Sequence, residues 1–166
     1  DVLLSNAGTN KPRPFVDTPA ADFDAVMNLN VRAAYFVAQA AARRMMAAGE
    51  GSIIHISSQM GHVGGANRSV YCMTKHAIEG LTKALAVELG PSNIRVNAVA
   101  PTFAETPMTK PFFEDPEFKR DVLSRIPLGR MASPEDVANA VCFLASPAAR
   151  SINGHSLLVD GGWTAQ

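Results

Sequence analysis

Short apolar runs alternate along the chain with longer segments whose hydrophobic positions have helical spacing. Runs rich in Val, Ile, Leu and Ala predict strands at residues 2–5, 52–57, 94–99 and 156–159. Turns containing Gly, Asn or Pro follow them. Because helical segments separate the strands, the pattern predicts strand–helix units packed into a parallel sheet.

The first predicted helix has a polar residue in its apolar stripe. Asp22 is a suitable N-terminal cap, and Gly49 and Gly51 end the helix. Its buried stripe, at steps of three and four, is predicted to hold Phe23, Val26, Met27, Asn30, Ala34 and Val37. Asn30 is therefore expected to point inward, where its amide needs hydrogen-bond partners.

The second predicted helix, residues 69–89, is stopped by Gly90 and Pro91. Tyr71 and Lys75 lie four residues apart, so both side chains occupy one face, about 6 Å from each other. We expect the Lys75 ammonium to lower the pKa of the Tyr71 phenol from its ordinary value of about 10. Such a tyrosine can act as a general acid or base. Taken alone, the pair is better explained as a half-exposed tyrosine beside a solvated lysine, since such spacings are common, and it becomes informative only with its surroundings.

Further polar residues converge on the same end of the predicted sheet. Ser58 follows the buried strand 52–57 and stands thirteen residues before Tyr71. In open α/β sheets, ligands bind at the carboxyl ends of the strands. Asn30, Ser58, Tyr71 and Lys75 are thus expected to face one crevice.

Two loops are predicted beside this crevice. Residues 101–116 hold several Pro and Phe residues, which predicts an irregular, partly apolar substrate lid. His62, in the loop after Ser58, is a candidate substrate contact. A third helix is predicted from Ser133 and Pro134 to about residue 145.

Composition narrows the class of protein. The chain has 166 residues, 47% hydrophobic, with 15 basic side chains against 15 acidic ones. This describes one globular domain, and the zero net charge argues against nucleic-acid binding. No apolar stretch has the length that a bilayer requires and no signal peptide is visible, so we predict a cytoplasmic chain without membrane partners. The His and Cys residues lack ligand spacing, so no metal site is expected.

The ordered set of motifs resembles the short-chain dehydrogenase/reductase family over essentially the whole chain. The matching pieces are Ser5-Asn6-Ala7-Gly8 for the family's Asn-Asn-Ala-Gly, Asn30, Ser58, Tyr71-x-x-x-Lys75, the strand 94–99 leading into Pro101, Thr106, and Val159-Asp160-Gly161-Gly162. The resemblance implies an α/β, Rossmann-like, doubly wound parallel sheet. It also implies that residues 1–166 form a single partial domain that carries the catalytic half of the fold.

The resemblance assigns a role to each candidate residue. Tyr71 would exchange a proton with the oxygen of a ketone or secondary alcohol, and Ser58 would hydrogen-bond that oxygen. Lys75 would hold the nicotinamide ribose, and Asn30 would position a water molecule linked to Lys75. The cofactor, NAD or NADP, would carry the hydride. The residues expected to bind it are Asn6, Ala7, Gly8, Tyr71, Lys75, Pro101, Thr102, Ala104 and Thr106.

Three departures from the family pattern stand out. Ser5 replaces the first Asn of the turn motif, and Thr102 replaces the usual Gly after Pro101. The third is larger, since no Gly-x-x-x-Gly-x-Gly occurs in the chain. We expect that N-terminal strand–helix units of about 90 residues are missing. With them would be lost the pyrophosphate cradle and the residue that chooses NAD or NADP.

The missing units would affect the chain by itself. The first strand would become a bare apolar edge, so we predict a chain that is marginally stable and inactive alone. The alternative to an enzyme is therefore a truncated, non-catalytic fragment or paralogue, acting at most as a subunit-interaction module. By resemblance, the intact parent would be a homo-oligomer, a tetramer or dimer. Within the family, the chain is similar to gluconate and other sugar-acid dehydrogenases and to 3-oxoacyl-carrier-protein reductases.

Overall fold

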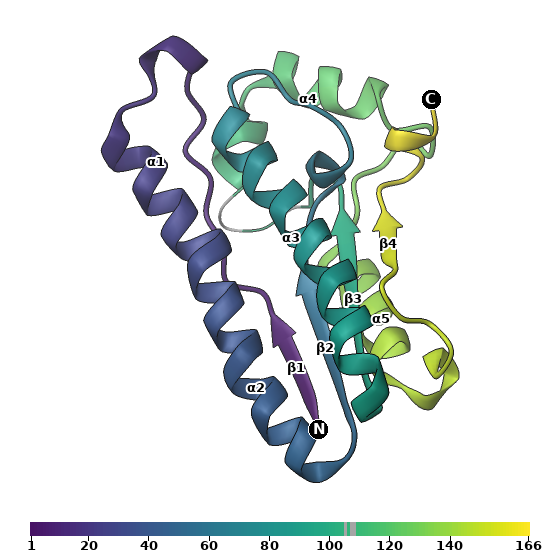
Figure 1. Ribbon diagram of the computed structural model, residues 1–166. Coiled ribbons are helices and arrows are strands. Elements are labelled where there is room, and N and C mark those ends of the chain that lie inside the picture. The colour runs from purple at the N-terminus through teal and green to yellow at the C-terminus, as the bar shows by residue number, and fades with distance from the viewer. Residues whose placement is uncertain (105, 107–108) are drawn as a thin grey trace.

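A four-stranded parallel sheet with the order β1-β2-β3-β4 forms the centre of the protein (Figure 1). The computed structural model describes residues 1–104, 106 and 109–166. The strands are β1 (Val2–Ser5), β2 (Gly51–Ile56), β3 (Ile94–Pro101) and β4 (Ser156–Val159). The predicted strands and their parallel pairing are confirmed, with β2 shifted by one residue and β3 extended by two.

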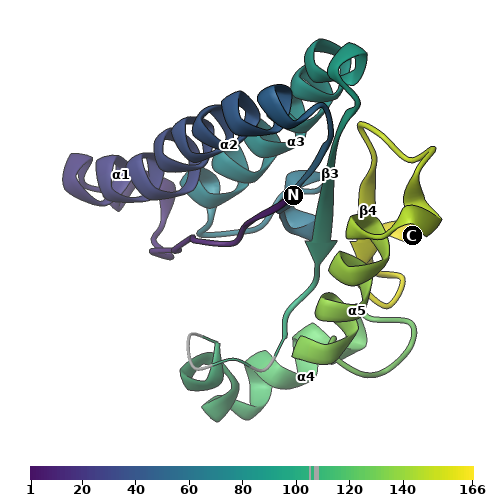
Figure 2. The same cartoon turned by 90° about the horizontal axis from the view of Figure 1, so that it is seen from below.

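Helices cover both faces of this sheet (Figure 2). One face carries α1 (Ala20–Met27), α2 (Ala34–Ala48) and α3 (Ser69–Leu89), and the other carries α5 (Pro134–Ala145). A further helix, α4 (Pro116–Ser124), lies beyond the carboxyl ends of the strands. Coverage on both sides confirms the doubly wound α/β fold, and the predicted bounds of α3 and α5 are confirmed as well.

The central strands are buried on both faces, which explains their nearly continuous apolar sequence. Successive side chains of a strand point to opposite faces, and β2 shows this at Ile53 and Ile54. Ile53 packs in a cluster with Met45 of α2 and Leu89 of α3. Ile54 packs in a second cluster with Leu144 of α5. One strand therefore joins the two cores.

The first predicted helix differs from the expectation at its start and in its middle. Asp22 does not cap it; Pro19 stands at the N-cap, and the Asp22 carboxylate accepts from Lys11 and Arg13 at 2.7 Å each. The reason is tertiary, since both cations come from the preceding loop. A turn of π-helix, Asn28–Ala33, separates α1 from α2. Such turns often occur at functional positions.

The buried stripe of these helices also differs from the prediction. Phe23 and Val37 are 40% and 49% exposed, so their assignment to the buried face was wrong. The buried positions instead follow a step of four, which the helix twist allows along one ridge. They are Val26, Asn30, Ala34, Ala38 and Ala42. Asn30 is buried, as predicted.

The proline-rich segment after β3 contains more regular structure than expected. A short 3₁₀ turn at Lys110–Glu114 precedes α4, where an irregular loop was predicted. The Asp115 carboxylate caps α4 by accepting from the backbone N–H groups of Glu117 and Phe118. Pro116 thus opens a helix at a position where its missing N–H costs nothing. The proposed lid includes Glu105, Pro107 and Met108, which lie outside the described residues.

Strand β1 lies at the edge of the described sheet. It pairs only with β2 among the described strands, and Val2 and Leu4 are 55% and 45% exposed. The predicted apolar edge is therefore present. Its effect on stability and aggregation stays a prediction.

Candidate active site at the strand ends

A cavity of about 570 Å³ opens at the carboxyl ends of the strands. Its walls come from the segments that follow β1, β2 and β3, from the first turns of α3, and from α5. Nine of the predicted site residues line it: Asn6, Gly8, Ser58, Tyr71, Lys75, Pro101, Thr102, Ala104 and Thr106. Ala7 and Asn30 are not among the lining residues. The fold thus brings together most of the predicted site, while the roles of its residues stay predictions.

Lys75 is buried in the floor of this cavity, with 6% of the residue exposed. Its Nζ donates to the Ile56 carbonyl oxygen at the end of β2, at 2.8 Å. Burial lowers the pKa of this ammonium from 10.5 to about 8, and the nearby Glu79 carboxylate opposes that change. Lys75 is therefore a desolvated side chain whose pKa lies close to neutral pH.

The predicted lowering of the Tyr71 pKa is wrong for this structure. Burial raises the pKa of the phenol, and a hydrogen bond with Ser58 and the charge of Arg68 act in the opposite direction. Lys75 Nζ lies 5.5 Å from the centroid of the Tyr71 ring and bonds to the backbone instead. The sequence indicated the closeness of Tyr71 and Lys75 but could not reveal that both side chains are desolvated.

Ser58 stands where β2 gives way to a short 3₁₀ turn. Its Oγ accepts from the Met60 backbone N–H at 3.1 Å and donates to Gln59 Oε1 at 3.0 Å. These bonds fix the hydroxyl, which lowers the pKa of the neighbouring Tyr71 phenol. Gln59, which is buried and lines the cavity, was missed because a glutamine after a strand has no distinctive sequence signal.

Asn30 lies behind the cavity wall and braces it. Its Oδ1 accepts from the Thr9 N–H at 2.8 Å, and its Nδ2 donates to the Thr9 carbonyl at 2.9 Å and to Thr74 Oγ1 at 3.1 Å. A Cβ at Gly8 would lie 3.4 Å from Asn30 Oδ1, a tight contact. Asn30 thus ties the turn after β1 to α3, next to Lys75. Both of its side-chain N–H groups are used.

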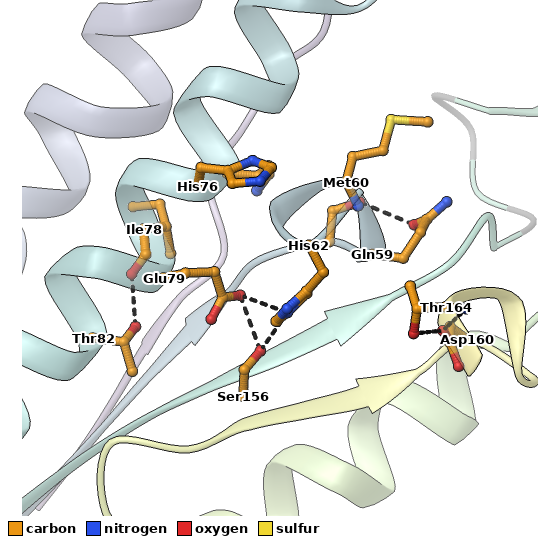
Figure 3. A network of polar contacts seen from close by, with 12 residues as sticks. Gln59, Met60, His62, His76, Ile78, Glu79, Thr82, Ser156, Asp160 and Thr164 are labelled. Atoms are coloured by element: carbon orange, nitrogen blue, oxygen red, sulfur yellow. Dashed lines mark hydrogen bonds and ion pairs between the residues drawn. The ribbon is translucent and has the colours of Figure 1, made fainter. Parts of the chain in front are cut away.

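His62 lies outside the cavity lining, contrary to the expectation that it contacts substrate. Figure 3 shows that it points toward Glu79 and Ser156 instead. Its Nε2 lies 3.0 Å from Ser156 Oγ and 3.3 Å from Glu79 Oε1, and the Ser156 hydroxyl donates to Glu79 at 2.9 Å. The buried Glu79 carboxylate attracts His62 away from the site. This network lies one helical turn after Lys75.

Arg68 is a site residue that the motifs did not indicate. It precedes α3, lines the cavity and places its Cζ 5.4 Å from the Phe103 ring centroid and 5.6 Å from that of Phe112. Its position three residues before Tyr71 was the available signal, since that spacing places it one turn away on the same side of the helix.

The walls fit a nicotinamide nucleotide at two points. Thr102 Oγ1 is buried at the cavity wall with no partner among the described residues, which suits a polar group of a ligand. The Lys75 ammonium has three donors, of which the described residues engage one. Two remain for acceptors such as ribose hydroxyls.

Comparison with known proteins places the chain in a family. A family model described as enoyl-(acyl carrier protein) reductase matches residues 1–164. The chain belongs to the short-chain dehydrogenase/reductase family. Family members are oxidoreductases acting on alcohols and carbonyls with NAD(P), which agrees with the predicted reaction class and cofactor.

The similar short-chain dehydrogenases/reductases include enzymes of sugars and sugar acids. The chain is 40% identical over 163 residues to 2-dehydro-3-deoxy-D-gluconate 5-dehydrogenase of Bacillus subtilis, covering 98% of this chain and 64% of the relative. It is 43% identical to L-xylulose reductase of Bos taurus, covering 99% of this chain and 68% of the relative. The chain thus spans about two thirds of their length.

A solved structure of a similar enzyme has nearly the same fold over the whole of this chain. Gluconate 5-dehydrogenase from Burkholderia cenocepacia, in complex with NADP and tartrate, superimposes with a TM-score of 0.98 at 34% identity. The match covers 100% of this chain and 65% of that one.

Two further classes of site were sought in the described part of the chain. Its His, Cys, Asp and Glu side chains nowhere gather in threes, as a metal ion would require. None of its helices combines the length and apolar character needed to cross a membrane.

Proposed function

We propose that the protein carrying this chain interconverts a secondary alcohol and a ketone of a sugar acid or polyol, with NAD(P)(H) as the hydride carrier. The observation that supports this most is the shared cavity wall of Ser58, Tyr71 and Lys75 at the strand ends. In this family's motif these residue types stand in this order and spacing. The names of the relatives support the substrate class.

Tyr71 acts as the general acid in reduction and the general base in oxidation. The phenol is protonated at neutral pH, since burial raises its pKa further above the ordinary value, and it can donate its proton to a carbonyl oxygen as negative charge develops there. Ser58 turns its hydroxyl from Gln59 Oε1 toward the same oxygen and stabilises that charge.

Lys75 and Asn30 support the proton transfer. Lys75, with a pKa near 8, stabilises the phenolate left behind and holds ribose hydroxyls with its remaining donors. Asn30 keeps the turn at Gly8 and Thr9 fixed against α3. Asn30 also positions a water molecule that links Lys75 to solvent, with the second lone pair of its Oδ1 as the acceptor.

The nicotinamide cofactor supplies the hydride when bound. Thr102 offers its unpartnered hydroxyl to the carboxamide end, and Pro101, Ala104 and Thr106 complete that wall. Asn6 and Gly8 line the cavity at the end of β1 and are assigned to the adenosine side, with Ala7 between them in the same turn.

A homo-oligomer is proposed from exposed apolar side chains on α2, two of which, Tyr35 and Phe36, contact each other through their rings. Tyr35, Phe36 and Val37 are 46%, 50% and 49% exposed in neighbouring positions. Contiguous apolar patches of this kind mark interaction surfaces. Light scattering on the full-length gene product tests this: a dimer or tetramer is expected, and Phe36→Asp should weaken it.

Turnover by the full-length gene product tests the proposed reaction. NADH or NADPH oxidation would be followed with 5-keto-D-gluconate, L-xylulose and a 3-oxoacyl thioester, the last because the cavity also has apolar walls. Tyr71→Phe should lower kcat about 10²- to 10⁴-fold. Tyr35→Phe, at an exposed tyrosine, is the matched control. Full activity in Tyr71→Phe would refute the proposed acid.

Cofactor binding by the isolated 166-residue chain tests whether this chain is inactive by itself. Titration with NADPH, followed by cofactor fluorescence, should show no saturable binding if the pyrophosphate cradle lies outside these residues. Saturable binding would refute the prediction that the chain alone is inactive. Absence of turnover in the full-length gene product would instead favour a non-catalytic protein.

A further inference from the structure

We propose that Arg68 binds the carboxylate of the substrate, so that the enzyme prefers oxo and hydroxy acids over neutral ketoses. This inference rests on the proposed function and specifies its substrate class. Three observations support it: the guanidinium lies in the cavity wall, its contacts leave its donors free of the described side chains, and the charges around it are positive.

The contacts of Arg68 orient it without using its hydrogen-bond donors. Its guanidinium lies against the rings of Phe103 and Phe112, which come from the segment after β3. Such cation–π contacts cover the guanidinium while leaving its five N–H donors free. Among the described residues it takes part in no ion pair and no side-chain hydrogen bond. With respect to the described residues, its donors are thus available to a ligand.

The charge of the cavity favours an anion. Its described lining contains two cationic side chains, Arg68 and Lys75, and no Asp or Glu. Burial lowers the pKa of Arg68, as expected for a charge removed from water, and no carboxylate of the described residues forms an ion pair with it. A carboxylate would supply that counterion and match the planar fork of the guanidinium with two parallel hydrogen bonds.

The order of residues along α3 separates the two cations by role. Arg68 stands one turn before Tyr71, and Lys75 stands one turn after it. Seven residues of helix correspond to about 10 Å along the axis. With Lys75 on the cofactor side, Arg68 lies on the far side of the reacting phenol. A carboxylate a few carbon atoms from the reacting carbonyl would reach it.

Steady-state kinetics of the full-length gene product test this assignment. Arg68→Gln should lower kcat/KM for 5-keto-D-gluconate about 10- to 150-fold, the range expected for a charge-assisted hydrogen bond, and leave kcat/KM for neutral L-xylulose within about twofold. Arg68→Lys keeps the charge but loses the fork, so it should recover part of the activity. Arg125→Gln is the matched control, because Arg125 also lies against an aromatic ring, Trp163, outside the cavity.

Four results would overturn the assignment. Equal losses with the acid and the neutral ketose would show a merely structural role. A raised KM for NADPH alone would place Arg68 on the cofactor. If Glu105→Gln reproduced the loss caused by Arg68→Gln, a partner within the chain would account for Arg68. A ketose phosphate assayed in parallel would reveal a preference for phosphate over carboxylate, which would also contradict it.

A binding measurement separates this inference from the proposed reaction. Calorimetric titration with D-gluconate should give binding that Arg68→Gln weakens by the same 10- to 150-fold, whether or not turnover occurs. Turnover of neutral ketoses without acid preference would refute the role of Arg68 and leave the reaction standing. Gluconate binding through Arg68 without turnover of any carbonyl would refute the reaction alone.

Discussion

Replacement of Lys75 by methionine should stabilise the fold while abolishing activity. Lys75 is 6% exposed, and its pKa is lowered from 10.5 to about 8, mainly by burial. At about 1.4 kcal/mol per tenfold change, that difference means that the buried ammonium costs about 3 kcal/mol at pH 7. Methionine has a similar length and carries no charge.

The gain is smaller than this cost because the ammonium also makes a hydrogen bond. The Ile56 carbonyl oxygen loses the donor that lies 2.8 Å away, which costs about 1–2 kcal/mol. The free energy of unfolding of Lys75→Met should therefore exceed that of the wild type by about 1–2 kcal/mol at pH 7. An active-site residue that lowers stability in this way is a common compromise between stability and function.

The stability difference between Lys75→Met and the wild type should depend on pH. Above pH 8 the folded protein releases the Lys75 proton, whereas the unfolded chain keeps it until about pH 10.5. The unfolded state then binds more protons, so the wild type gains stability as pH rises from 8 to 10.5 and the advantage of Lys75→Met disappears.

Urea unfolding of the full-length gene product at pH 7 and pH 10, followed by circular dichroism, measures both effects. Lys83→Met, at an exposed lysine of the same helix, is the control and should change stability by less than about 0.5 kcal/mol. A Lys75→Met protein that is less stable than the wild type at pH 7, or a difference that does not vary with pH, would refute the reasoning.

Three other predictions concern buried titratable groups. His55 is buried, and neither of its ring nitrogens has a hydrogen-bond partner among the described residues. Burial lowers its pKa from 6.5 to about 4, so between these pH values the unfolded chain binds a proton that the folded chain does not. The free energy of unfolding should therefore fall by about 2.5 kcal/mol between pH 7 and pH 4.5. Urea midpoints should show that His55→Leu removes most of this loss, whereas a change at the exposed His76 does not. In Tyr35→Phe, Tyr71 is the only remaining tyrosine of this chain, so ultraviolet titration of the isolated chain should give a phenol pKa above 10; a value near neutrality would contradict the described burial. Glu79→Gln removes a negative charge that raises the Lys75 pKa, so the part of the pH–rate profile that reports Lys75 should move to lower pH. An unchanged profile would show that Glu79 does not affect the Lys75 pKa.

The features that depend on local sequence were predicted well. The strands and the helices α3 and α5 followed from hydrophobic period and from stop signals such as Gly90 and Pro91. Ser58, Tyr71 and Lys75 converge because parallel strands end at one edge of the sheet, a rule that needs no side-chain detail.

The features that depend on tertiary contacts were not predicted. Asp22 bonds to two cations of the preceding loop rather than to its own helix. The π turn coincides with Asn30, whose amide bonds to two other segments of the chain. The raised pKa of Tyr71 needs a measure of burial, and the position of Arg68 needs the contact with Phe103 and Phe112. Each of these arises from residues far apart in the sequence.

Single-turnover transfer of deuterium measures the proposed hydride and proton transfer together. The full-length gene product would be mixed with NADPH or NADH deuterated at the reactive carbon and with 5-keto-D-gluconate or L-xylulose, and the product analysed by mass spectrometry. Deuterium is expected on the new carbinol carbon, with a transfer rate that falls at least about 100-fold in Tyr71→Phe and stays unchanged in Tyr35→Phe. Transfer that is as fast without the Tyr71 hydroxyl, or no transfer to any carbonyl compound, would contradict it.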